Sequence, residues 1–130
     1  MPTWDIILDK SDVGLADMEK AAGTVIDIDL FDNTADGQTT VKELGKTKQV
    51  ICYFSAGSRE DWRDDADQFT SADYGKALGD WPGENWVDVK STNVRAIMKQ
   101  RIESAAKAGC TAVDPDNVDG FVRHLSSMNL

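Results

Sequence analysis

The chain has 130 residues, and its 14 Lys and Arg against 23 Asp and Glu give a formal net charge of −9. This acidic balance argues against a nucleic-acid partner, which needs clustered basic residues to displace counterions from phosphates. The first ten residues contain no signal-peptide core, and no apolar run reaches the roughly 20 residues of a membrane span. We therefore expect a single domain over residues 1–130 with no membrane partner, and we assign no localisation.

The N-terminal part alternates between strand and helix patterns. A strand is predicted at 4–8, a helical segment at 12–22, and a second strand at 24–31. In the second strand the apolar residues share one face, and Asp27 and Asp29 share the other. We therefore expect this carboxylate face not to be packed against a helix.

The middle of the chain continues the alternation and then loses it. A short helix is predicted at 40–44 with Gly45 as its C-cap, followed by an apolar run at 49–57 that predicts a strand buried on both faces. Residues 58–84 show no strong periodicity. A connection of this length is usually functional or contains short helices of its own.

The C-terminal part contains the clearest helix. A short strand is predicted at 84–89, and a helix then begins at Ser91, Thr92 or Asn93 and ends at Gly109. The residues expected on its buried face are Val94, Ile97, Met98, Ile102 and Ala105. A last strand follows at 111–117. Together these elements predict an α/β fold with four or five parallel strands.

Acidic residues follow the third and last strands, where ligands of α/β folds collect. The segment 114–120 has the spacing of a calcium loop at its start, but Val118 and Leu125 occupy later ligand positions, so an EF-hand is excluded and no metal is assigned. Two alternatives remain for this segment. It is either a turn capped by its own Asp and Asn side chains, or a carboxylate site of the kind glycoside hydrolysis requires. The segment 55–65 is correspondingly either a solvated charged loop or part of the same site.

Other residues leave alternatives open. Trp62, Trp81 and Trp86 either stack on sugar rings or pack the loops onto the sheet. Cys52 and Cys110 lie in or beside apolar strands, which favours buried thiols over a disulfide. The single histidine, His124, has no nucleophile partner at a recognisable turn, and no phosphate-binding glycine loop is present, so no cofactor is expected.

Five blocks in order resemble glycoside hydrolase family 114, the endo-α-1,4-polygalactosaminidase family with a TIM-barrel domain. The blocks are VIDIDLFD at 25–32, VICYFSAGSREDWR at 50–63, WPGENWVDV at 81–89, NVRAIMKQRI at 93–102 and DPDNVDG at 114–120. A TIM barrel has about 250 residues, so the resemblance implies the N-terminal half of one. It also implies hydrolysis of galactosamine-containing polysaccharide, in a family whose members are often secreted and are in part labelled α-galactosidases.

The resemblance assigns roles to single residues. Asp116 matches the strand-end aspartate of the family and is implied as nucleophile or as stabiliser of the oxocarbenium-like transition state. The residues implied in substrate binding are Asp29, Tyr53, Glu60, Arg63, Asp114, Asn117 and Asp119.

The chain also departs from the family pattern. Thr111 stands where the family commonly has Asp, Asp64 stands where Pro is expected, and the resemblance stops after Gly120. The second catalytic carboxylate, a Glu on a later strand of the family, is absent from the sequence. Two alternatives to hydrolysis follow: an inactive carbohydrate-binding remnant, or a half-barrel that closes as a homodimer.

Overall fold

The computed structural model describes residues 1–9, 13–35 and 37–120, and the tail with His124 lies outside the described residues. The chain divides into two compact units. The first comprises Met1–Phe54 and Arg101–Asp114, and the second comprises Ser55–Gln100 and the described residues from Pro115 onward. Within the described ranges, no helix is both long and apolar enough to span a bilayer.

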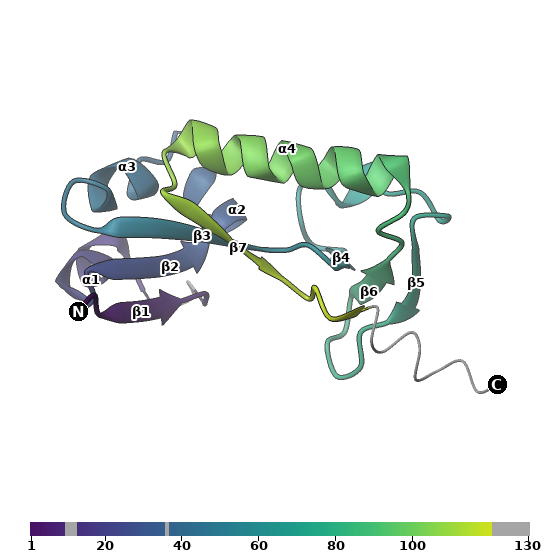
Figure 1. Ribbon diagram of the computed structural model, residues 1–130, viewed down its shortest axis with the longest axis horizontal. Helices are drawn as coiled ribbons and strands as arrows, with labels where there is room; N and C mark the ends of the chain where they lie inside the picture. Colours follow the sequence, from purple (N-terminus) through teal and green to yellow (C-terminus); the bar gives the residue numbers. More distant parts are fainter. Residues whose placement is uncertain (10–12, 36, 121–130) are drawn as a thin grey trace. The chain divides into compact units, whose positions relative to one another are not determined.

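A parallel sheet of four strands forms the centre of the first unit (Figure 1). Its strands are β1 (Trp4–Ile7), β2 (Val25–Asp29), β3 (Gln49–Ser55) and β7 (Ala112–Asp116), in the order β1-β2-β3-β7. The predicted α/β architecture is therefore confirmed.

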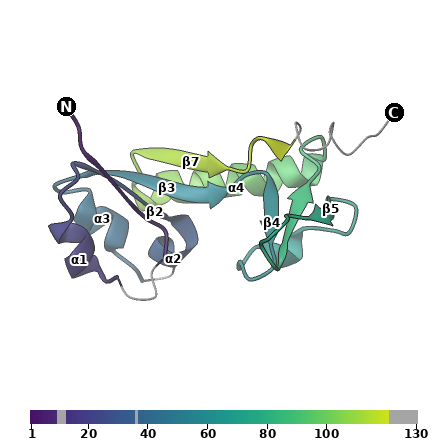
Figure 2. The ribbon, with the colours of Figure 1, turned by 90° about the horizontal axis from the view of Figure 1, so that it is seen from below.

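Short helices cover one side of these strands: α1 (Leu15–Lys20), α2 (Leu30–Thr34) and α3 (Thr40–Leu44) (Figure 2). On β3, Val50, Cys52 and Phe54 are fully buried, whereas Ile51 and Tyr53 between them are only half-buried. The prediction that this strand is buried on both faces is therefore wrong for one face. The alternation leaves that face partly open to solvent.

The second predicted strand ends earlier than expected. β2 stops at Asp29, whose carboxylate Oδ1 accepts a hydrogen bond from the Asp32 backbone N–H at 2.9 Å and so caps α2. The side chains of Asp27 and Asp29 are both buried, although Ile51 and Tyr53, which share their face of the sheet, are only half-buried. An N-cap carboxylate satisfies a backbone donor that the first helical turn leaves unpaired, which is why the strand gives way to a helix at this residue.

The long helix α4 (Thr92–Ala108) begins and ends as predicted (Figure 1). Ser91 Oγ accepts from the backbone N–H groups of Asn93 and Val94, and Gly109 follows the last turn with φ +98°. The buried carboxylate of Asp73 holds this start in place. It accepts from the Ser91 and Thr70 hydroxyls, the Asn93 amide and the Thr70 backbone N–H, and these bonds lower the Asp73 pKa, that from Ser91 most.

The buried face of α4 differs from the prediction at one position. Val94, Ile97 and Ala105 are buried as expected, but Ile102 is 48% exposed and Arg101 is only 2% exposed. The guanidinium of Arg101 lies 4.9 Å from the centre of the Phe31 ring, a cation–π contact. An Arg can be buried here because its long apolar stem packs while its charge rests on the ring.

The second unit contains a three-stranded antiparallel sheet in the order β4-β6-β5. Its strands are β4 (Ser58–Glu60), β5 (Tyr74–Ala77) and β6 (Glu84–Val87), with a 3₁₀ turn at Ala66–Gln68. The short strand predicted at 84–89 is β6, which pairs antiparallel with β4 and β5. Of the four or five parallel strands predicted, the described residues form four in one sheet.

Candidate functional site

Carboxylates gather on the face of the parallel sheet that α1, α2 and α3 leave uncovered. The register places Asp27 beside Ile51 and Asp29 beside Tyr53, and residues paired in this way share a face. On β7, Asp114 and Asp116 share a face by the same alternation. The polar face reaches the carboxyl ends of the strands, where α/β enzymes place their chemistry.

Two of these carboxyl groups in the first unit form a pair. Asp27 is 3% exposed, and its side chain hydrogen-bonds to that of Asp114. Burial, this hydrogen bond and the repulsion between the two charges raise the pKa of Asp27 to about 7. Because two close carboxylates cannot both ionise easily, Asp27 keeps its proton up to about pH 7.

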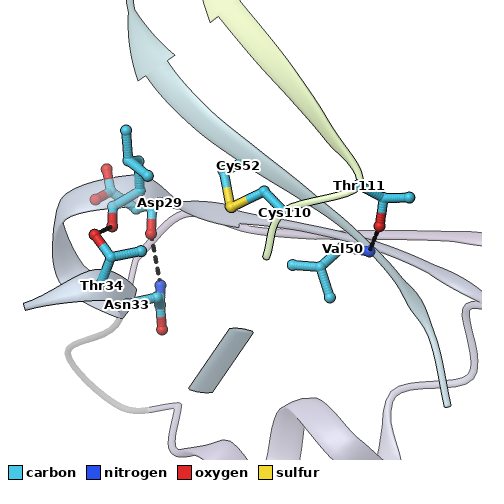
Figure 3. The surroundings of a disulfide bond; sticks show 8 residues. Asp29, Asn33, Thr34, Val50, Cys52, Cys110 and Thr111 are labelled. Carbon is cyan, nitrogen blue, oxygen red and sulfur yellow. Dashed lines mark hydrogen bonds between the residues drawn. A yellow bond between two sulfur atoms is a disulfide. The ribbon is translucent and has the colours of Figure 1, made fainter. Parts of the chain in front are cut away.

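Asp29 and Tyr53, both candidates for substrate binding, occupy the next layer toward the strand ends. The carboxylate of Asp29 caps α2, and its backbone carbonyl accepts from Asn33 Nδ2 at 2.8 Å (Figure 3). Asp29 is therefore fixed by α2, while Tyr53 is half-buried beside it in the register. This arrangement leaves Tyr53 the more accessible of the two side chains.

Cys52 and Cys110 form a disulfide, so the favoured prediction of buried free thiols is wrong (Figure 3). Their Cα atoms lie 6.0 Å apart although 58 positions separate them in sequence. Beside the disulfide, the Thr111 hydroxyl accepts from the Val50 backbone N–H at 3.0 Å, and the Thr111 N–H donates to the Val50 carbonyl at 2.7 Å. The residue that departs from the family pattern thus helps to fasten the start of β7 to β3.

In the second unit the end of β7 is clamped to the turn after β3. The Asp116 carbonyl accepts from the backbone N–H groups of Ala56 and Gly57 at 2.9 and 3.2 Å. A Cβ on Gly57 would lie 1.8 Å from the Asn117 carbonyl oxygen, so only glycine fits. Asn117 has φ +59°, a left-handed conformation that Asn tolerates. Asp116 is exposed to solvent, and the hydrogen bonds to its carbonyl hold its backbone in place.

A chain of three hydrogen bonds, two of them buried, supports this clamp. Asn117 Nδ2 donates to Ser55 Oγ at 2.9 Å, the hydroxyls of Ser55 and Ser58 hydrogen-bond at 2.6 Å, and Ser58 Oγ donates to Glu84 Oε2 at 2.7 Å. No role was predicted from the sequence for Ser55, Ser58 or Glu84. The only sequence signal was the small polar residues directly after an apolar strand, because the partner Glu84 is distant in the chain.

Glu60 and Arg63, two further candidates for substrate binding, bind each other. Arg63 Nη2 donates to Glu60 Oε1 at 2.9 Å, and both side chains are buried. This buried ion pair orders the loop after β4. Asp119, in contrast, is exposed.

The candidates divide between the two units. Asp29, Tyr53 and Asp114 belong to the first, and Glu60, Arg63, Asp116, Asn117 and Asp119 belong to the second. Across the part of the chain that the structure describes, no group of three or more His, Cys, Asp or Glu residues is arranged to hold a metal ion. The chemistry that these residues offer is that of carboxylates and amides.

Comparison with known proteins relates these residues to a family. The model of glycoside-hydrolase family GH114 matches residues 1–130. The crystal structure of Aspergillus fumigatus Ega3 in complex with galactosamine is 41% identical with a TM-score of 0.76, and the match covers 93% of this chain and 46% of that chain. No curated protein matches the chain in sequence.

A second solved structure shares the fold. The glycoside hydrolase domain of PelA from Pseudomonas aeruginosa is 17% identical with a TM-score of 0.67, and the match covers 92% of this chain and 45% of that one. The chain therefore spans less than half the length of the solved structures that it matches. A four-stranded parallel α/β sheet of this extent is consistent with part of a TIM barrel.

Proposed function

The chain belongs to glycoside-hydrolase family GH114, and on this premise we propose that it carries part of a site that hydrolyses α-1,4 linkages in galactosamine-containing polysaccharide. The likeness to Ega3, whose crystal structure contains galactosamine, supports this class of substrate. Because the chain covers less than half of that protein, its own activity is part of the proposal.

Asp116 is the proposed catalytic carboxylate. The observation that carries this assignment is the fixed geometry of its backbone, held by the N–H groups of Ala56 and Gly57 at the carboxyl end of β7. Glycoside hydrolysis needs one carboxylate at the anomeric carbon, as nucleophile or stabiliser, and a second group that protonates the leaving oxygen. A backbone held in this way suits the first role because it carries the carboxylate at a defined position.

The second carboxylate is proposed to come from the part of the family fold that this chain does not span. Within the second unit, Asn117 and Asp119 are proposed to contact the sugar with Asp116. Tyr53 and Asp114 are proposed sugar contacts that belong to the first unit. Asp29, Glu60 and Arg63, which make the capping and ion-pair contacts described above, contribute chiefly by ordering the loops.

The test is release of reducing ends from a galactosamine oligosaccharide by the 130-residue chain at high concentration. Turnover that Asp116→Asn abolishes supports the proposal, and Asp67→Asn, at an exposed position of the 3₁₀ turn, is the matched control. Absence of turnover from the unmodified chain contradicts an autonomous enzyme. Calorimetric binding without turnover then identifies the alternative, an inactive carbohydrate-binding form.

The edges of the four-stranded sheet favour a homodimer, in which a second copy would pair with these edges, as the alternative assembly. β1 and β7 are the edges of the four-stranded sheet, and Trp4 and Ile6 on β1 are largely exposed. Unpaired edges and exposed apolar side chains are features that a further set of strands would cover. Light scattering decides this point, because a monomeric mass excludes the homodimer.

A further inference from the structure

Two large aromatic side chains stand exposed in the second unit. Trp62 is 53% exposed and Trp81 is 65% exposed, whereas Trp86 on β6 is half-buried against Gly120. Tryptophan is among the most buried residues on average, so two exposed rings in one short segment call for a physical reason. The proposed site at Asp116 does not use either ring.

The two rings are supported by the same turn. Trp81 opens a tight turn in which its carbonyl accepts from the Glu84 N–H at 3.2 Å, and the Gly83 carbonyl accepts from the Asp61 N–H at 3.0 Å. Gly83 has φ +90°, and a Cβ there would lie 3.0 Å from Trp62 Cζ3. The Trp62 ring therefore rests on the turn that begins with Trp81. Both side chains therefore branch from backbone that these hydrogen bonds hold in place.

The surroundings of the rings are acidic. Residues 60–84 contain eight Asp and Glu against two Lys and Arg, and one of those two, Arg63, is bound to Glu60. Asp61 and Asp80, the neighbours of the two rings in sequence, are exposed, and a Cβ on Gly83 would lie 2.6 Å from Asp61 Oδ1. A neutral ligand gains nothing from this charge, whereas a cationic ligand is attracted by it and by the negative faces of the rings.

We propose that Trp62 and Trp81, flanked by the carboxylates of Asp61 and Asp80, form a binding surface for a polymer of cationic amino sugars. Each ring presents a flat apolar face for a sugar ring, and a protonated amino group over that face gains a cation–π interaction. The choice of galactosamine as the sugar rests on the proposed function. The surface binds successive sugar units of the polymer and does not take part in bond cleavage.

The test is isothermal titration of the 130-residue chain with a galactosamine oligosaccharide and with its fully N-acetylated counterpart, which lacks the positive charges. Trp62→Ala and Trp81→Ala are each expected to weaken binding of the charged oligosaccharide about two- to fivefold, the equivalent of one exposed cation–π contact. Trp4→Ala is the matched control, since Trp4 is also exposed, at 58%, but lies on β1. Circular dichroism checks that each variant is folded.

The outcomes separate this proposal from the preceding one. The double variant Trp62→Ala, Trp81→Ala is measured as well. The surface is supported, even if no turnover is found, when this variant binds the charged oligosaccharide more weakly, Trp4→Ala binds it unchanged, and the unmodified chain binds the N-acetylated oligosaccharide less tightly than the charged one. Equal affinities of the double variant and the unmodified chain overturn it, even if Asp116-dependent turnover is found. No binding of the charged oligosaccharide at millimolar concentration, or equal binding of both oligosaccharides, also overturns it.

Discussion

The Cys52–Cys110 disulfide determines how firmly the strand that ends at Asp116 is held. It joins the middle of β3 to the residue at the entrance of β7, and it closes a chain segment of 58 positions. The substitution Cys110→Ser breaks this link and leaves Cys52 as a buried thiol. The free energy of unfolding should fall because the unfolded chain regains the freedom that the link removes.

The loop length sets the magnitude of this fall. In the chain-entropy model a closed loop of 58 positions is worth about 4 kcal/mol at 25 °C. Small domains have about 5–15 kcal/mol in total. The variant is therefore expected to lose a large share of its stability, and the double variant Cys52→Ala, Cys110→Ser should lose slightly more because of the smaller buried side chain.

The assay is urea unfolding followed by circular dichroism, on the oxidised chain, the reduced chain and both variants. Titration of free thiols before reduction establishes that the oxidised sample is linked. Two free thiols titrated in the unreduced chain would contradict the disulfide. A difference of less than about 1 kcal/mol between the oxidised and reduced chains would contradict the entropic stabilisation.

Three further predictions follow from single contacts. Folding raises the pKa of Asp27 from 3.8 to about 7, so between these pH values the folded chain binds more protons than the unfolded chain. The urea midpoint of unfolding should therefore fall as pH rises from 3.8 to about 7, and the variant Asp27→Asn should show a smaller fall. The lowered pKa of Asp73 has the opposite effect: the ionised carboxylate stabilises the folded chain above about pH 4, and this stabilisation is lost on acidification. In thermal melts Asp73→Asn should therefore have a lower melting temperature than the unmodified chain at about pH 6, and the difference should shrink as the pH is lowered toward about 2. Gly57→Ala places a Cβ against the Asn117 carbonyl and should lower the free energy of unfolding by about 1–3 kcal/mol. Gly75→Ala, whose added Cβ has no atom near it, should leave the stability unchanged, and equal melting temperatures of the two variants would contradict the clamp.

Local patterns predicted those elements whose signals lie within a few residues of each other. The α4 start at Ser91 and its end at Gly109 follow from capping chemistry that operates inside one turn. The same holds for α3, predicted at 40–44 and found at Thr40–Leu44. The ordered motifs also indicated the family, which the family model confirms.

Features that depend on distant residues were missed or misjudged. The pairing of Cys52 with Cys110 depends on two strands being placed side by side, which no spacing in the sequence reveals. Whether β6 pairs parallel or antiparallel depends on its partner β4. The residues of β6 favour a strand but do not determine the direction of its pairing. The roles of Asp29 and Arg63 in the described contacts likewise depend on what the fold places beside them.

The α/β class, most of the strand and helix positions and the family were predictable from the amino-acid sequence, because periodicity, capping residues and ordered motifs are properties of neighbouring residues. The clamped backbone of Asp116, the hydrogen bond between Asp27 and Asp114 and the packing of Trp62 on the turn of Trp81 are visible only in the folded chain. Burial and hydrogen bonding between residues far apart in the chain fix the charge and orientation of these groups, and those contacts exist only once the chain has folded.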